Sequence, residues 1–245
     1  MKNYKLEIAY DGTRYYGWEH QPDRDTIQGK IEKVLALLCG TEVEVIGAGR
    51  TDAGVHARAM VANVHMETDK TPGEIRDYMN HYLPEDICIN DVRECSDRFH
   101  ARYNAVGKHY TYTLYVGDLK PLFRRKYVTV CEKCPDTEKM RAAAAYLIGK
   151  HDFKSFSANP NMKKSTVREL YDIEILRKKD LIYLNFHGEG FLQNMVRIMV
   201  GTLLLAGEGK IPPERVGEIL LSKDRRQAGP TAPPEGLCLM KVDYE

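Results

Sequence analysis

The chain has 245 residues, enough for one large domain or two small ones, each with its own hydrophobic core. Hydrophobic residues at 43% and charged residues at 29% are globular values and argue against general disorder. The formal net charge of +1 argues against a uniformly basic nucleic-acid binder, and no apolar run approaches the roughly 20 residues of a membrane span. The N-terminus lacks the apolar core of a signal peptide, so we expect a cytoplasmic protein with reduced cysteines.

The first half of the chain alternates between strand and helix patterns. Alternating apolar residues from Tyr4 to Tyr10 predict a strand, and Thr26 caps a predicted helix that ends at Gly40. Thr71 opens a second helix with the spacing of a capping box. The other elements predicted here are strands at 43–47, 59–66 and 87–95, and the second helix runs over 71–83.

The second half repeats this alternation. Strands are predicted at 108–116, 127–131, 167–176, 181–186 and 237–242, and helices at 136–149, at 192–205 and just after Pro213. The helix at 192–205 is largely apolar, so we expect it to be buried. The pattern predicts two α/β halves, 1–104 and 105–245, with a cleft between them as the expected place for a site.

The most informative motif is the stretch from Gly47 to Arg58. Its three glycines allow tight turns and a close approach of a ligand to the backbone. Asp52 stands there between two arginines, Arg50 and Arg58, and cationic neighbours favour an ionised carboxylate that can act as a nucleophile. A β-turn that carries a surface ion pair explains the same residues, so the motif by itself leaves both interpretations open.

Basic residues gather in two segments despite the near-zero net charge. Residues 98–126 contain seven Lys and Arg against Asp118, and residues 150–168 contain five against Asp152. Aromatic residues are interleaved with the first segment, a combination that suits a polyanion bearing bases. A solvated charged face has the same composition, so the choice between them depends on the motifs.

Several motifs together carry a family resemblance. GRTDAGVHA, at 49–57, is similar to the signature of the tRNA pseudouridine synthase A family, whose aspartate is the catalytic nucleophile. Four further segments resemble the family in the expected order: YYGW with IQGKIE (15–18 and 27–32), FHAR with KHYTY (99–102 and 108–112), GFLQNMVR (190–197) and DRRQAGPTAPPEGL (224–237). The resemblance therefore extends from one end of the chain to the other.

The resemblance implies a function and a set of roles. Asp52 is the expected nucleophile, Tyr110 contacts the target base, Arg197 stands beside the aspartate, and Arg50 fills the space of the flipped base or binds a phosphate. The implied reaction isomerises uridine at positions 38–40 of the tRNA anticodon stem-loop. The implied protein is a homodimer that needs no cofactor, metal or membrane. Its implied fold is α+β, with two halves that share a central, mainly antiparallel sheet.

Some features leave alternatives open. Glu19 stands where the family pattern has glutamine, and His109 where arginine is frequent, so an enzyme of the same chemistry that acts on another RNA remains an alternative. A non-catalytic RNA-binding module is a second alternative, which the presence of Asp52 together with Tyr110 and Arg197 argues against. Cys131 and Cys134 form a CxxC without a second ligand pair, which favours a strand-end pair over a zinc or redox site.

Overall fold

A computed structural model describes residues 1–159, 162 and 164–245. The chain divides into two compact units: unit 1 is Met1–Val106 with Cys238–Glu245, and unit 2 is Gly107–Leu237. The last strand thus groups with the N-terminal residues, and the division into halves at 104/105 stays a prediction. Among the described residues, no helix is both long and apolar enough to cross a membrane.

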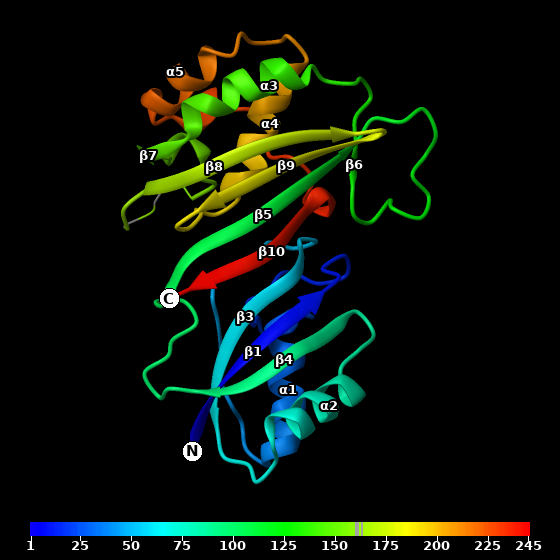
Figure 1. Cartoon of the computed structure of the whole chain (residues 1–245), viewed down its shortest axis with the longest axis vertical. Helices are drawn as coiled ribbons and strands as arrows, with labels where there is room; N and C mark the ends of the chain where they lie inside the picture. Colours follow the sequence, from blue (N-terminus) through cyan, green and yellow to red (C-terminus); the bar gives the residue numbers. More distant parts are fainter. Residues whose placement is uncertain (160–161, 163) are drawn as a thin grey trace. The chain divides into compact units, whose positions relative to one another are not determined.

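Unit 1 is a sheet covered by two helices (Figure 1). Within it β1 pairs with β3 and β4, β2 pairs with β3, and all these pairs are antiparallel, whereas β10 runs parallel to β3. Leu6 and Ile8 on β1 are fully buried, as the alternating pattern predicted. Its elements are β1 (Lys2–Tyr10), α1 (Ile27–Cys39), β2 (Val45–Gly47), β3 (His56–Met66), α2 (Pro72–Tyr82), β4 (Ile87–Cys95) and β10 (Leu237–Tyr244).

Local capping signals fix both helices of unit 1. The Thr26 side chain accepts a hydrogen bond from the Gly29 N–H at the start of α1, and Gly40 ends the helix with a left-handed φ of 72°. At the start of α2, Thr71 and Glu74 form the predicted capping box. The buried faces of α1 and α2 then pack toward the sheet, which confirms both predicted helices.

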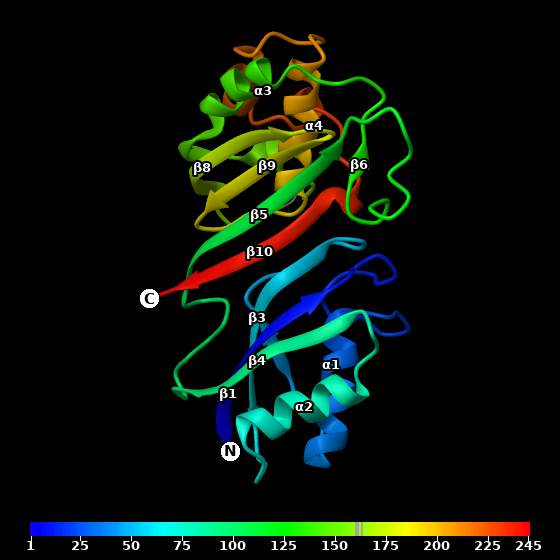
Figure 2. The same ribbon diagram turned by 45° about the vertical axis from the view of Figure 1, so that its right-hand side comes forward.

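Unit 2 pairs β5, β9, β8 and β7 in that order, all antiparallel, with β6 parallel to β5. Figures 1 and 2 show α3, α4 and α5 together on one side of the β8–β9 hairpin. The predicted α+β class with mainly antiparallel pairing is confirmed. The elements are β5 (Ala105–Tyr115), β6 (Thr129–Val130), α3 (Thr137–Ala144), β7 (Gly149–Asp152), β8 (Val167–Lys178), β9 (Leu181–Gly188), α4 (Met195–Gly207) and α5 (Arg215–Ser222), with 3₁₀ turns at Ala145–Leu147, Lys154–Phe156, Arg225–Gln227 and Pro234–Gly236.

Two predicted helices in unit 2 have wrong boundaries. The helix expected over 136–149 ends at Ala144, continues as a 3₁₀ turn, and gives way to the unpredicted strand β7 at Gly149, whose φ is 103°. The helix expected from 192 begins only at Met195, because Asn194 has a left-handed φ of 58°. The chain is already extended at Ile148, so the first difference precedes Gly149, whereas the second comes from Asn194 alone.

Candidate active site

Asp52 lies on the loop that joins β2 to β3 in unit 1. The loop is anchored to the sheet where the Ala48 N–H donates to the Val61 carbonyl at 2.8 Å, and it turns where the Val55 N–H donates to the Asp52 carbonyl at 3.1 Å. The side chain of Asp52 is half-buried. The register of β1 on β3 pairs Tyr10 with Ala57, so the loop lies at the end of the sheet where β1 stops.

A second segment, residues 15–18, holds this loop by backbone hydrogen bonds. The Trp18 N–H donates to the Thr51 carbonyl at 3.1 Å, and the Gly54 N–H donates to the Tyr15 carbonyl at 3.3 Å. Gly17 has a φ of 97°, and a Cβ at this position would lie 2.7 Å from the Thr51 carbonyl oxygen. Only glycine therefore allows the two backbones to approach so closely on either side of Asp52.

Buried side chains support the same loop from the sheet. The Tyr10 hydroxyl and the Thr51 hydroxyl are 2.8 Å apart and hydrogen-bonded, and both residues are buried. The Tyr10 and Trp18 rings are in contact, with centroids 6.0 Å apart. A nucleophile needs a fixed orientation, and the residue before Asp52 is fixed through both its side chain and its carbonyl.

Two residues near Asp52 in the sequence, Arg50 and His56, differ in their surroundings. Arg50 forms an ion pair with Glu19, and 68% of the arginine side chain remains exposed. His56 is buried at 4% exposure, and its Nδ1 accepts a hydrogen bond from the Gly12 N–H at 3.1 Å. Arg50 is thus available to a ligand from solvent, whereas His56 packs behind the loop.

In unit 2, Tyr110 lies on β5 opposite Phe186 of β9. Its side chain is 8% exposed, and its ring meets the Phe191 ring edge to face at a centroid distance of 5.2 Å. Tyr112, two residues on, is fully buried, and its hydroxyl donates to the Pro233 carbonyl at 2.7 Å. The two tyrosines therefore lie on one face of β5, and Tyr112 serves the core.

Arg197 projects from the first turn of α4 in unit 2. Its Nε donates to the Ala232 carbonyl at 2.7 Å, and a terminal nitrogen donates to the Asn194 side chain at 2.9 Å. The Ala232 N–H in turn donates to the Arg197 carbonyl at 3.1 Å. The segment at 228–232 thus fixes the guanidinium, a contact that the sequence analysis missed because no local pattern signals it.

The predicted site residues fall into two pairs. Asp52 and Arg50 share one loop of unit 1, and Tyr110 and Arg197 lie in unit 2. Tyr10 and Gly17 are supporting residues that the sequence analysis did not single out as functional. The alternation of β1 placed Tyr10 in the core but did not signal its bond to Thr51.

The CxxC at 131–134 consists of free thiols. Burial, with smaller contributions from Glu208 and Cys134, raises the pKa of the Cys131 thiol to about 11. A metal ligand or a redox nucleophile needs the thiolate, which such burial disfavours near neutral pH. The geometry therefore supports the structural interpretation of this pair.

Comparison with known proteins identifies the protein family to which the chain belongs. A family model described as tRNA pseudouridine synthase matches residues 8–104 and 143–245. The chain is 43% identical to tRNA pseudouridine synthase A of Clostridium kluyveri and 44% identical to tRNA pseudouridine synthase A 2 of Clostridium perfringens, each over 244 residues. It is 46% identical over 245 residues to tRNA pseudouridine synthase A of Bacillus sp. KSM-64, and each match covers 100% of both chains. The chain belongs to the tRNA pseudouridine synthase family, and it is an isomerase that acts on tRNA.

Proposed function

We propose that this protein converts uridine to pseudouridine at positions 38–40 of the tRNA anticodon stem-loop, with Asp52 as the nucleophile. The observation that carries the proposal is the loop of Asp52, which is clamped by backbone bonds from Trp18 and to Tyr15. Full-length relatives named tRNA pseudouridine synthase A support the substrate class. The family resemblance supports the choice of positions.

The reaction rearranges one nucleotide. The N1–C1′ bond of uridine breaks, the uracil turns, and a C5–C1′ bond forms, while C5 loses a proton and N1 gains one. Because all atoms of the substrate remain in the product, the chemistry needs no cofactor or energy source. The base is inaccessible in the stacked stem-loop, so the nucleotide must flip into a pocket. Asp52 then forms a covalent adduct at C1′ or at C6.

The other predicted residues support this step. Tyr110 packs on the uracil, and its hydroxyl is the proposed relay for the C5 proton. Arg197, held by Ala232 and Asn194, is the cation that the family resemblance assigns to the support of Asp52. Arg50, largely exposed beside Asp52, binds a phosphate next to the flipped nucleotide or fills the space of the base.

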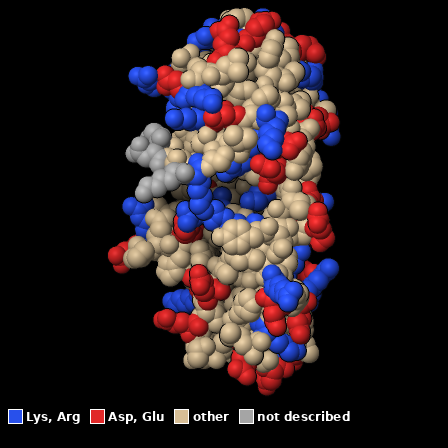
Figure 3. All heavy atoms as spheres, turned by 90° about the vertical axis from the view of Figure 1, so that its left-hand side faces the viewer, with Lys and Arg blue, Asp and Glu red and all other residues tan. Residues whose placement is uncertain are grey.

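The proposed partner is tRNA, bound by a cytoplasmic homodimer. Figure 3 shows Lys and Arg interspersed with Asp and Glu over the visible face. Binding therefore depends on local groups of cations rather than on net charge. One such group, at 117–127, projects from unit 2 between β5 and β6 in Figure 2. It carries Lys120, Arg124 and Arg125 beside the 92% exposed Phe123, a combination that suits a phosphate backbone and an unstacked base.

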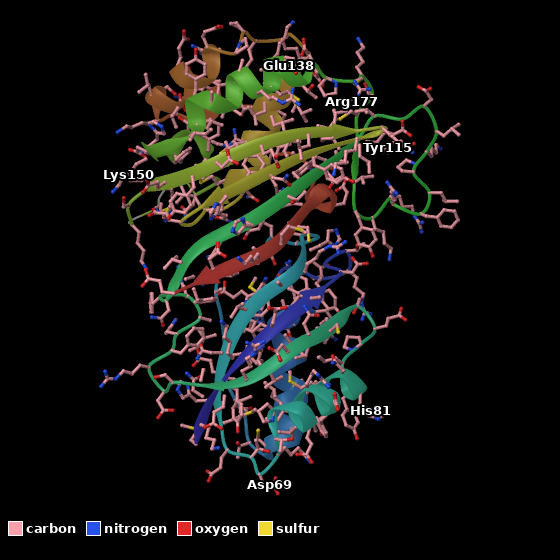
Figure 4. All side chains as sticks on the ribbon, viewed as in Figure 1. Asp69, His81, Tyr115, Glu138, Lys150 and Arg177 are labelled. Atoms are coloured by element: carbon pink, nitrogen blue, oxygen red, sulfur yellow. The ribbon has the colours of Figure 1, made fainter. Side chains whose placement is uncertain are left out.

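The test is Asp52→Asn, which keeps the shape of the side chain and removes the nucleophile. Turnover of an unmodified tRNA transcript should fall by more than about a thousandfold, while tRNA affinity stays nearly unchanged. Asp69→Asn is the matched control, because Asp69 is an exposed aspartate of the same unit in the turn before α2 (Figure 4). Residual activity of Asp52→Asn within about tenfold of wild type would contradict the assignment. A wild-type protein that binds tRNA without forming pseudouridine would instead support the RNA-binding module.

A further inference from the structure

The ion pair between Arg50 and Glu19 joins two segments whose backbones are already fixed to each other. Glu19 follows Trp18, and the Trp18 N–H donates to the carbonyl of Thr51, the residue after Arg50. The Trp18 carbonyl in turn accepts from the Gln28 N–H of α1 at 2.9 Å. Backbone hydrogen bonds therefore hold the residues next to Glu19 and Arg50 in place, so the Glu19 carboxylate lies against the Arg50 guanidinium. Arg50 itself stands two residues before Asp52.

Both partners of this pair remain accessible to solvent. The side chain of Arg50 is 68% exposed and that of Glu19 is 44% exposed. Exposed ion pairs contribute little to stability, because water and salt screen them and two long side chains must be ordered. The ion pair can therefore open readily. Its main effect is on the affinity of Arg50 for other anions.

A carboxylate and a phosphate use the same donors of a guanidinium. Arginine binds either anion through its planar fork of N–H groups, so two anions that use the same N–H group compete. Glu19 contacts one terminal nitrogen of Arg50, so an RNA phosphate that binds through that nitrogen competes with the Glu19 carboxylate. The displaced carboxylate then stays close to the RNA as an unpaired negative charge.

We propose that Glu19 is a positioning residue for Arg50. In the free protein it forms an ion pair with Arg50, and on RNA binding a phosphate replaces Glu19 as the partner of Arg50. This inference rests on the proposed function, since it needs Arg50 to meet the tRNA. Glu19 lowers affinity for tRNA because a phosphate that takes the shared nitrogen of Arg50 breaks the pair. Glu19 also reduces the salt dependence of binding. The RNA phosphate releases a bound cation when it contacts Arg50, but the freed Glu19 carboxylate attracts a cation from solution, so the net release is smaller.

The experiment replaces Glu19 by glutamine, which has the same shape and no charge. We expect the KM for unmodified tRNA to fall about twofold to fivefold, the range that an exposed ion pair supports, with the change in KM rather than in kcat. In the Asp52→Asn background, where no turnover occurs, the affinity for the RNA should rise by a similar factor. The slope of log affinity against log salt should steepen by up to about 0.7–0.9, the value for one additional phosphate contact.

Two controls separate this mechanism from a general change in charge. Glu94→Gln removes the same charge from an ion pair with Lys2, whose Nζ lies 2.8 Å from the carboxylate, at the opposite end of β1 from Tyr10. Its 50% exposure resembles that of Glu19, and we expect neither KM nor salt slope to change. Glu19→Gln should also have no effect when Arg50 is already glutamine, since the effect passes through Arg50.

The outcomes distinguish this inference from the proposed function. If the wild-type protein forms pseudouridine but Glu19→Gln matches it in KM and salt slope, the role of Glu19 is refuted and the function stands. If Glu19→Gln still raises tRNA affinity in the Arg50→Gln background, the role of Glu19 is refuted as well. That result would show that Glu19 repels the RNA directly and does not act through Arg50. Absence of pseudouridine with the wild-type protein refutes the function, while the binding comparison still decides the role of Glu19.

Discussion

Tyr110 and Tyr112 stand two residues apart on β5 and have different environments. The Tyr112 hydroxyl is hydrogen-bonded to the Thr129 hydroxyl and to the Pro233 carbonyl, and the side chain is fully buried. Burial raises the pKa of Tyr112 well above its ordinary value, so its hydroxyl stays protonated. A structural role is therefore established for Tyr112 by its contacts, whereas the proposed role of Tyr110 concerns the substrate.

Tyr110→Phe should consequently affect turnover, and Tyr112→Phe should affect stability. Tyr110→Phe keeps the ring that packs on Phe191 and removes the proposed proton relay, so kcat should fall by about 10²-fold or more with little loss of stability. Tyr112→Phe should cost about 1–3 kcal/mol of stability, because the buried Thr129 hydroxyl loses its hydrogen-bond partner and the Pro233 carbonyl loses its donor, and should retain turnover. The kcat on a tRNA transcript and the free energy of unfolding in urea, measured for each variant, test both predictions. A Tyr110→Phe variant that reacts at the wild-type rate would show that the hydroxyl transfers no proton.

At the scale of elements, α4 is fastened to the segment that follows α5. The Gly229 N–H donates to the Thr202 hydroxyl at 2.9 Å, and the Arg225 guanidinium donates to the Gly229 carbonyl at 3.0 Å. A Cβ on Gly201 would lie 1.8 Å from the Pro230 carbonyl oxygen. The helix and the segment are therefore in backbone contact one turn after Arg197, and this contact brings Ala232 to the guanidinium.

Gly201→Ala should push these two backbones apart. We expect a loss of stability of about 1–3 kcal/mol, typical of overpacking, together with reduced turnover, because the Ala232 carbonyl moves away from Arg197. Gly73→Ala is the matched control, since a Cβ at that position in α2 meets nothing within 4 Å. That control should be neutral or stabilising, as alanine is favoured over glycine in helices. Unfolding by urea measures both, and an unchanged stability of Gly201→Ala would mean that the segment tolerates displacement.

The elements that the sequence predicted well are those with local signals. The caps at Thr26 and Thr71 and the alternation along β1 depend on residues within a few positions of each other, so they could be recognised without the fold. The late start of α4 follows from the backbone of Asn194, and nothing in the apolar pattern marks that residue as left-handed. β7 was missed because its four residues, Gly149–Asp152, form a strand only by pairing with β8.

The same distinction applies to the candidate site. The loop of Asp52 was found from its composition, because glycine and charge occur together within it. The contacts that hold it, from Tyr10 and Trp18, span 41 and 33 positions and have no local signature. Ala232, which orients Arg197, contributes only a carbonyl, which every residue type possesses. A sequence pattern therefore cannot predict contacts that are made by backbone groups of this kind.

At the scale of the whole molecule, the end of the chain completes the unit that its beginning starts. β10 pairs in parallel with β3 at Cys238 and Leu239, opposite His56 and Ala57, directly after the loop of Asp52. The Tyr244 hydroxyl donates to the Ala101 carbonyl at 2.7 Å. The Lys5 ammonium lies 4.2 Å from the centre of the Tyr244 ring. The strand that supports the candidate nucleophile thus depends on the last eight residues.

Deletion of residues 238–245 should therefore loosen unit 1 more than unit 2. Without β10, the start of β3 keeps only its pairing with β1, and the Ala101 carbonyl loses its donor, so amide exchange should accelerate along β3 and β1. The β8–β9 hairpin pairs within unit 2 and should keep its protection. Turnover of tRNA should be lost with the support of the Asp52 loop. Deletion of Glu245 alone is the control, because it removes no strand residue and should change neither exchange nor turnover. Unchanged protection of β3 after the longer deletion would show that its other ladder partners, β1 and β2, suffice to hold the loop.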